Sequence, residues 1–386
     1  MPKKQSIFFP NLDGLRFICF LMVFLFHSYK TLFANVPGAE STVGFLFQHG
    51  ELGVNFFFVL SGFLITFLLI REREFTGTIH IGNFYLRRIL RIWPLFYLCV
   101  FIGFVVWPYL KTFMGDAVDE TSNPLYYLLL INNFDYIHQQ SISTQLFPDA
   151  LILIVLWSVA VEEQFYLSWP VLLRFIGKSL YPILFIGIIG LTLWFRSRYA
   201  FAPEEDIHAR AVLKFHTLAV IGDMAVGALM AYNCSREGWL YRWVKAMPRY
   251  QMALLYAAVV AILLFHHILF PEGFMMVPER LIIAIIFGLV ILEQNYAEKS
   301  FYKFSSFTRI SQLGTYTYGL YCYHFLVISL MSKIFSKFGW SDSSFAYATI
   351  YSLLSLAFVI ILSILSYRYF EKPFLKLKDR FAFIVK

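Results

Sequence analysis

Residues 53–70 read GVNFFFVLSGFLITFLLI, eighteen consecutive residues without a charged side chain. The hydrocarbon core of a bilayer is about 30 Å thick, and a helix needs about 20 mainly apolar residues to cross it. An uncharged run of this length therefore predicts a membrane-spanning helix. This one stretch indicates which class of fold to expect for the whole chain.

The overall composition agrees with a membrane protein. Of the 386 residues, 59% are hydrophobic, 20% are aromatic and 15% are charged. Soluble domains carry about 25% charged residues, and the mean hydropathy of +0.65 is strongly apolar. An ordinary water-soluble fold is excluded, and the sequence predicts an all-α, polytopic integral membrane bundle.

Nine further apolar runs are long enough to cross a bilayer, so we expect about ten transmembrane helices. The runs at 181–196 and 281–295 are the shortest of them. The predicted spans are 12–33, 46–70, 92–112, 148–171, 181–196, 211–233, 250–270, 281–295, 316–335 and 345–367.

The connections between the spans alternate in charge, and this predicts their orientation. The chain has 32 Lys and Arg against 24 Asp and Glu, a net charge of +8. The basic residues sit in short connections between apolar runs, which favours a role in membrane topology over nucleic-acid binding. By the positive-inside rule both termini are cytoplasmic, in agreement with an even number of spans. The basic set includes Lys3, Lys4, Arg71, Arg73, Arg236, Arg242, Lys245 and Arg249, and the acidic set includes Asp116, Asp119, Glu120, Asp135, Glu204, Glu205 and Asp206.

Residues 1–386 are predicted to form one membrane domain, without an internal repeat or a soluble domain at either end. The N-terminal stretch lacks a small-residue cleavage site, so we interpret it as leading into the first span. In the outer connection 113–147, the apolar stretch Pro124 to Phe134 is too short to span, which favours an interfacial or re-entrant segment. The four cysteines are scattered singly and predict neither a disulfide framework nor a metal site.

Arg16 and His27 are ionisable residues inside the first predicted span. A charge at the centre of a span costs about 2.5–3.5 kcal/mol on insertion scales, so each is a candidate functional residue. Eleven residues are close to three helical turns, which places both side chains on one face, about 16 Å apart. His27 then lies in the outer half of the bilayer, where a neutral imidazole can act as a general base. The alternative is that Arg16 reaches the cytoplasmic surface and His27 makes one hydrogen bond between helices.

Residues 157–166, WSVAVEEQFY, place two adjacent carboxylates inside the fourth span. Ser158, Glu162 and Tyr166 are four residues apart and share a helix face, with Trp157 and Glu163 beside it. Buried carboxylates need a cation nearby, and Arg16 or an arginine of 87–91 could supply it. The alternative is an ion pair that only fixes helix packing.

Residues 84–94, FYLRRILRIWP, predict a basic patch where the third span leaves the cytoplasm. Arg87, Arg88 and Arg91 fall within one helical turn of each other, and guanidinium groups bind phosphate oxygens in a bidentate way. A topology anchor on lipid headgroups is the simpler alternative for these three residues considered alone.

Several further polar residues lie in apolar runs. His324 is surrounded by tyrosines in YTYGLYCYHF, residues 316–325, and such a histidine more often makes structural hydrogen bonds than catalyses a reaction. Asn55, Ser61 and Gly62 form a small polar strip, interpreted first as a helix-packing surface. His216, Asp223, His266 and His267 receive no assignment. Nucleotide-binding, serine-hydrolase and zinc-protease motifs are not found in the sequence.

Together these stretches resemble the bacterial membrane-bound acyltransferase-3 family, which includes O-antigen acetylases and related cell-surface O-acyltransferases. The matching stretches occur in the family's order and extend from residue 12 to residue 373. They are LDGLRFICFLMVFLFH (12–27), GVNFFFVLSGFLIT (53–66), FYLRRILRIWPLFY (84–97), WSVAVEEQFYLSWP (157–170), and YTYGLYCYHF (316–325) with YRYFEKP (367–373).

The resemblance implies about ten spans, an acyl-CoA donor on the cytoplasmic side and a sugar hydroxyl as acceptor outside. It implies that Arg16 and His27 are the family's essential basic–histidine pair, and that 87–91 and 157–166 are its arginine and tryptophan–serine–glutamate motifs. Asn55 stands where an Asp is common, and Thr317 where a Ser is usual. The esterase-like domain fused to some members is not seen, so we expect transfer to finish on this domain or on an extracytoplasmic partner protein.

The resulting hypothesis is an O-acyltransferase of the bacterial inner membrane that moves an acyl group, expected to be acetyl, onto a glycan or lipid-linked glycan. Arginines bind the acyl-CoA, and a polar channel is expected to take its pantetheine arm past Arg16 toward His27. His27 is the general base or a transient acyl carrier. Arg16 and Glu162 are further catalytic residues, and Glu162 is expected to orient the imidazole or stabilise its protonated form. A thioester is already activated, so we expect no metal. Membrane lipids are expected partners and nucleic acid is not.

A transporter or flippase for a polar or lipid-linked solute is the main alternative function, and a non-catalytic glycan-binding relative is a third possibility. Cofactor-binding residues are Arg87, Arg88 and Arg91; substrate-binding residues are Trp157, Ser158, Tyr166, Glu163, His324 and Asn55.

Overall fold

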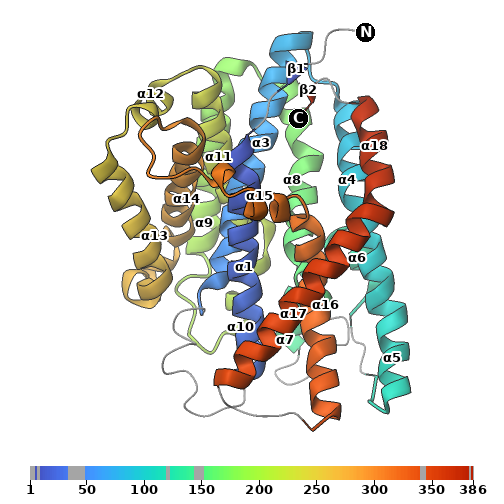
Figure 1. Ribbon diagram of the computed structural model, residues 1–386. Helices are drawn as coiled ribbons and strands as arrows, with labels where there is room; N and C mark the ends of the chain where they lie inside the picture. The colour runs from blue at the N-terminus through green and yellow to red at the C-terminus, as the bar shows by residue number, and fades with distance from the viewer. Residues whose placement is uncertain are drawn as a thin grey trace.

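The protein is a bundle of long helices in the computed structural model, which describes residues 5–6, 9–33, 48–118, 122–142, 152–339, 345–381 and 384–385 (Figure 1). The longer helices are α1 (Pro10–Phe33), α3 (Gly53–Thr76), α4 (Ile81–Phe101), α8 (Leu156–Phe175), α9 (Tyr181–Ser197), α11 (Thr217–Ser235), α13 (Arg249–Leu269), α14 (Glu279–Tyr296), α16 (Thr317–Lys337) and α17 (Phe345–Ser366). The shorter ones are α5 (Trp107–Met114), α6 (Pro124–Leu128), α7 (Asn132–Ile142), α10 (Ile207–Phe215), α12 (Trp239–Lys245), α15 (Thr308–Gly314) and α18 (Lys372–Lys378). The all-α membrane bundle predicted from the sequence is confirmed.

The two ends of the chain lie together. Strand β1 (Gln5–Ser6) pairs in parallel with β2 (Ile384–Val385), and both lie at the same end of the bundle (Figure 1). We call this end the termini end. Its arrangement agrees with an even number of crossings, while its assignment to the cytoplasm stays a prediction.

Each of the ten predicted spans corresponds to a helix or a pair of helices. In the described residues, eight segments are long and apolar enough to cross a membrane. The other two predicted spans, 148–171 and 281–295, correspond to α8 and α14, which carry charged residues within them. Residues 148–151 of the predicted span 148–171 lie outside the described part of the chain. Four charged residues used for the topology prediction also lie outside it: Lys3, Lys4, Asp119 and Glu120.

Several helix boundaries differ from those predicted, and two of the differences bear on the site. The third span was expected to begin at residue 92, but α4 already begins at Ile81 and therefore contains the three arginines. Arginine is a good helix former, so the helix continues beyond the apolar run. The span at 211–233 is divided at His216, whose backbone is extended and whose Nδ1 accepts a hydrogen bond from the Leu218 amide at 3.1 Å. A side-chain acceptor at this position starts a new helix.

Helices α3 and α11 pack closely against each other. A Cβ atom added to Gly62 would lie 2.0 Å from the Met224 carbonyl oxygen, and one added to Gly227 would lie 2.0 Å from the Val59 carbonyl oxygen. The two backbones therefore touch, as small residues permit in membrane helices. The packing role predicted for Gly62 is confirmed.

The apolar stretch Pro124 to Phe134 does not form a spanning helix. It forms α6 and the first turn of α7, with Leu130 between them at a φ of 58°. The Gln164 side chain of α8 fixes the second of these short helices by donating to Asn133 Oδ1 at 2.9 Å and to the Leu130 carbonyl at 3.1 Å.

Replacing Gly62 by Ala is expected to destabilise the protein, because overpacking against a backbone atom costs about 1–3 kcal/mol. The matched control is Gly187→Ala on α9, where an added Cβ meets no atom within 4 Å. We expect the control to be neutral or slightly stabilising. Apparent melting temperatures in detergent measure the difference, and equal values for the two variants would contradict the packing described for α3 and α11.

Candidate active site

A cavity of about 430 Å³ lies between the helices. Its walls come from α1, α3, α4, α8, α16 and α18, and from the π-helical segment Tyr367–Glu371 that joins α17 to α18. On α3 alone the lining residues extend from Val54 to Leu68, a distance of about 21 Å at 1.5 Å per residue. The cavity is therefore elongated along the bundle and covers a large part of its depth.

Positive charge gathers where the cavity lies nearest the termini end. Arg87, Arg88, Arg91 and Lys378 all contribute to its lining. Arg87 forms an ion pair with Glu72 at 2.8 Å and donates to the Phe381 carbonyl at 2.9 Å. No ion pair involves Arg88 or Arg91 within the described residues, so the charge at this end of the cavity is only partly neutralised.

Arg88 is held by aromatic rings rather than by a carboxylate. Its guanidinium lies 5.5 Å from the ring centre of Phe84 and 5.3 Å from that of Tyr166. Its Nε atom is buried and has no hydrogen-bond partner in the part of the chain that is described. A buried donor without a partner is costly.

Arg16 of α1 also lines the cavity. Its guanidinium forms an ion pair with Asp13 at 2.7 Å, one turn earlier in the same helix. Arg16 is therefore paired locally and does not neutralise Glu162, as the sequence had suggested it could.

Glu162 lies on the cavity wall and is bound by hydroxyl groups. Ser61 donates to its Oε1 at 2.8 Å, and Tyr166 donates to its Oε2 at 2.9 Å. The two hydroxyls lie 3.1 Å apart, which closes a three-membered network between α3 and α8. Both carboxylate oxygens thus have partners without an ion pair.

Ser158 and Tyr321 form the part of the wall that leads toward His27. Their hydroxyls are 2.7 Å apart, and both residues line the cavity. The ring of Phe57 packs edge-on against Tyr321 at 5.9 Å. His27 is not among the lining residues, so the open passage expected between the arginines and the imidazole stops at this layer.

His27 pairs with a second histidine behind that layer. Its Nδ1 lies 3.0 Å from Nε2 of His324, and Nδ1 of His324 lies 2.6 Å from the Tyr321 carbonyl oxygen. A carbonyl oxygen only accepts, so His324 carries its proton on Nδ1 and offers the lone pair of Nε2. His27 then donates from Nδ1, which leaves its Nε2 unprotonated in the neutral form.

The remaining predicted site residues lie away from the cavity. Trp157 packs edge-on against Phe58 and Phe215. Glu163 accepts a hydrogen bond from Trp93 at 2.9 Å. Asn55 is buried, and its Nδ2 has no partner in the described residues. These three residues do not line the cavity, and neither do His27 and His324. The predicted site residues that share the cavity are Arg16, Arg87, Arg88, Arg91, Ser158, Glu162 and Tyr166.

Sequence reasoning missed several lining residues. Ser61 was predicted to serve packing, but it binds Glu162. Tyr321 was noted only as a neighbour of His324. Glu371 and Lys378 come from the C-terminal segment, and only their position in the fold brings them to the cavity. The YRYFEKP stretch contained a signal for the first of them, because it places an acid directly after a span.

A family model described as an acyltransferase domain matches residues 9–365 of this chain. The chain belongs to the acyltransferase-3 family. The match extends over nearly the whole bundle, and of the cavity wall it leaves out only the part after residue 365, the segment Tyr367–Glu371 and α18 with Asp379. The resemblance found in the sequence motifs is confirmed.

The curated relatives of this acyltransferase-3 chain are named as O-acetyltransferases. This chain is 28% identical over 387 aligned positions to peptidoglycan O-acetyltransferase OatA of Listeria monocytogenes. The alignment covers 95% of this chain and 56% of that protein. A putative O-acetyltransferase of Staphylococcus aureus is 28% identical over 392 positions, which cover 97% of this chain and 58% of that protein. The putative peptidoglycan O-acetyltransferase YrhL of Bacillus subtilis is 34% identical over 172 positions, which cover 43% of this chain and 24% of that protein.

This acyltransferase-3 chain thus spans little more than half the length of the first two relatives. No solved structure matches it.

A cysteine in place of Ser61 is expected to react with a small water-soluble thiol reagent, because the side chain lines the cavity. The four native cysteines are free and buried, so they give little background. An anionic reagent should react about tenfold faster than a cationic one, since the arginines concentrate anions. Labelling rates measured by mass spectrometry test this.

The matched control is Ser355→Cys, at a position of 0% exposure on α17 that does not line the cavity. It should stay unlabelled. Equal labelling of the two cysteines, or faster labelling of Ser61→Cys by the cationic reagent, would contradict the cavity and its charge.

Proposed function

We propose that the protein is a membrane O-acetyltransferase that transfers an acetyl group from acyl-CoA at the termini end to a hydroxyl group of a cell-wall glycan, in the bacterial cell membrane. The family and the names of the relatives support the reaction class and the acceptor. The observation that carries the proposal is the elongated cavity, with arginines at one end and the Ser158–Tyr321 layer in front of His27 at the other.

The arginine end of the cavity suits the phosphate groups of acyl-CoA. Guanidinium groups bind phosphate oxygens in charge-assisted, bidentate pairs. Arg88 and Arg91 form no ion pair among the described residues, and Arg88 Nε has no partner there. The pantetheine arm is long and thin, and in this proposal it extends along α3 past Glu162 toward Ser158.

His27 is the base in this proposal. Its unprotonated Nε2 takes the proton of the acceptor hydroxyl while the hydroxyl oxygen bonds to the thioester carbonyl carbon. The carbon–sulfur bond breaks, and the CoA thiolate leaves and receives the proton from the imidazolium. His324 positions the imidazole and fixes its tautomer, the role that the sequence had given to Glu162. Attack by His27 itself, which would form an acyl-imidazole, uses the same lone pair.

The Ser158–Tyr321 layer has to open for the thioester to reach His27. The hydroxyl–hydroxyl bond of 2.7 Å and the packing of Phe57 hold Tyr321 across the end of the cavity. Rotation of this one side chain would join the cavity to the histidine pair. In this proposal Tyr321 therefore controls whether the thioester can reach His27.

Replacing Arg88 by Gln is expected to raise the KM for acetyl-CoA about tenfold or more, because a hydrogen bond to a charged group contributes about 1.5–3 kcal/mol. Arg236→Gln is the matched control, since Arg236 is exposed, lies outside the cavity and donates to Tyr232. Release of free CoA by the purified full chain, with and without a glycan acceptor, measures both. No CoA release under any condition would favour the transporter alternative.

Replacing His27 by Ala is expected to lower the rate of acetyl transfer about 100-fold or more, the contribution of a positioned base. His324→Ala should lower kcat, leave the KM for acetyl-CoA unchanged and alter the pH profile of kcat, which a packing defect would not do. His138→Ala, at an exposed position on α7, is the control. Undiminished transfer by His27→Ala would remove the base from the mechanism.

A further inference from the structure

Three histidines meet where α3 begins and α13 ends, on the side of these two helices that faces away from the termini end (Figure 1). His49 precedes the short 3-10 helix Gly50–Leu52 at the start of α3, and His266 and His267 lie near the end of α13, which runs away from the termini end (Figure 1). One ring nitrogen of each lies within 4.8 Å of those of the other two. The ring of His49 stacks on that of His266 at 4.5 Å and meets that of His267 at 4.7 Å.

Local backbone geometry brings the three rings together. Consecutive residues of a regular helix point about 100° apart, so neighbouring histidines on a helix do not normally face the same group. Phe265 interrupts α13 with a φ of −120° and a ψ of 27°, directly before the pair. His49 is held against α1 by Gly50, where an added Cβ would lie 2.2 Å from the Met22 carbonyl oxygen.

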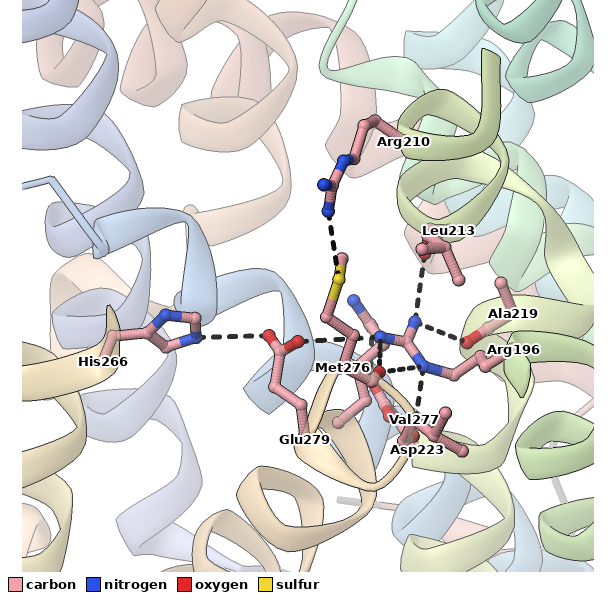
Figure 2. A network of polar contacts seen from close by, with 10 residues as sticks. Arg196, Arg210, Leu213, Ala219, Asp223, His266, Met276, Val277 and Glu279 are labelled. Carbon is pink, nitrogen blue, oxygen red and sulfur yellow. Dashed lines mark hydrogen bonds and ion pairs between the residues drawn. The ribbon is translucent and has the colours of Figure 1, made fainter. Parts of the chain in front are cut away.

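A carboxylate orients one of the rings from behind. Nε2 of His266 lies 3.2 Å from Oε1 of Glu279, and Oε2 of Glu279 lies 3.7 Å from Arg196 (Figure 2). Arg196 is itself buried and donates to backbone carbonyls on both sides, including Met276 at 2.5 Å and Leu213 at 3.1 Å. The carboxylate is thus fixed in place, and it defines which nitrogen of His266 carries a proton.

The second ring nitrogen of His266 is left without a hydrogen bond by the described residues. Its Nδ1 is buried and has no hydrogen-bond partner among the described residues. With Nε2–H directed to Glu279, Nδ1 carries a lone pair. A buried lone pair beside two further imidazoles is an unfavourable arrangement unless a cation or a proton occupies the space. A proton would place a positive charge among three crowded rings, whereas a metal ion uses one lone pair from each ring. His49 Nε2 lies 2.7 Å from the Gln48 side-chain amide. With the oxygen of this amide turned toward the ring, Nε2 donates to it and Nδ1 of His49 is left as the ligand.

We propose that His49, His266 and His267 bind a divalent transition-metal ion of the zinc class, with Nδ1 of His266 as one ligand and Glu279 as its second-shell carboxylate. Neutral imidazoles suit Zn²⁺, Ni²⁺ and Cu²⁺, whereas Mg²⁺ and Ca²⁺ prefer oxygen ligands. A carboxylate behind a ligating histidine is the usual means of fixing its tautomer and raising its basicity. Three protein ligands leave a fourth position open to water or another ligand.

The ligand atoms need only small movements to reach bonding distance. Zinc–nitrogen bonds of about 2.0–2.1 Å in a tetrahedron place ligand nitrogens about 3.3 Å apart. His267 is exposed and can rotate, while His49 and His266 are already held by their neighbours. The three histidines do not line the cavity, so the ion takes no part in the transfer step proposed above.

The test is titration of the purified full chain, without a histidine tag and after dialysis against a chelator, with Zn²⁺ in competition with a chromophoric chelator. We expect one equivalent to bind, and His267→Ala to weaken binding at least 100-fold. Since His267 is exposed, this variant should fold normally. Glu279→Gln should weaken binding about 10–100-fold, as second-shell changes do. His138→Ala is the matched control and should bind as the unmodified protein does.

Binding of no ion, or equal affinity of His267→Ala and the unmodified protein, would overturn the site. Unchanged affinity in Glu279→Gln would overturn the ligand arrangement proposed here. Co²⁺ offers a second readout, since its visible spectrum reports the number of imidazole ligands. A spectrum that is the same with and without His267 would also overturn the proposal. None of these measurements depends on acetyl transfer, so they stand whether or not the proposed function holds.

Discussion

Polar groups inside a membrane bundle must find their partners within the protein, because the hydrocarbon core offers none. Most of the buried charges described here meet this requirement. Glu162 is bound by Ser61 and Tyr166, Arg196 by backbone carbonyls, and Asp223 pairs with Arg280. The exceptions are therefore informative. They include Nε of Arg88 at the cavity and Nδ1 of His266 in the histidine cluster, both of which lack a partner within the described residues.

Helix α3 connects these two regions. It begins beside His49, supplies cavity-lining residues from Val54 to Leu68, and ends near the arginines of α4. Its close contact with α11 at Gly62 fixes its position in the bundle. A helix held so firmly provides one rigid wall, against which the side chain of Tyr321 can move. The proposed transfer would use this combination of a fixed wall and one movable side chain.

Helical periodicity accounts for the part of the site that could be predicted from the sequence. Ser158, Glu162 and Tyr166, spaced four residues apart, do lie on one wall of the cavity, and the three arginines of α4 do lie together. Arg16 and His27 were placed on one face of α1, yet only Arg16 reaches the cavity. The face of a helix is set by its own residues, but where a cavity ends is set by side chains of other helices, here Ser158 and Tyr321.

The sequence by itself determined that the chain is an all-α membrane bundle, where its spans lie, and to which family it belongs. These properties follow from the length, composition and order of apolar runs and motifs, which are local along the chain. The tertiary structure alone decided that His324 orients His27, that hydroxyls rather than arginines bind Glu162, and that His49 meets His266 and His267. Apart from Tyr166 with Glu162 and His266 with His267, these contacts join residues 101 to 297 positions apart. Such pairings depend on how whole helices pack, and no local pattern encodes them.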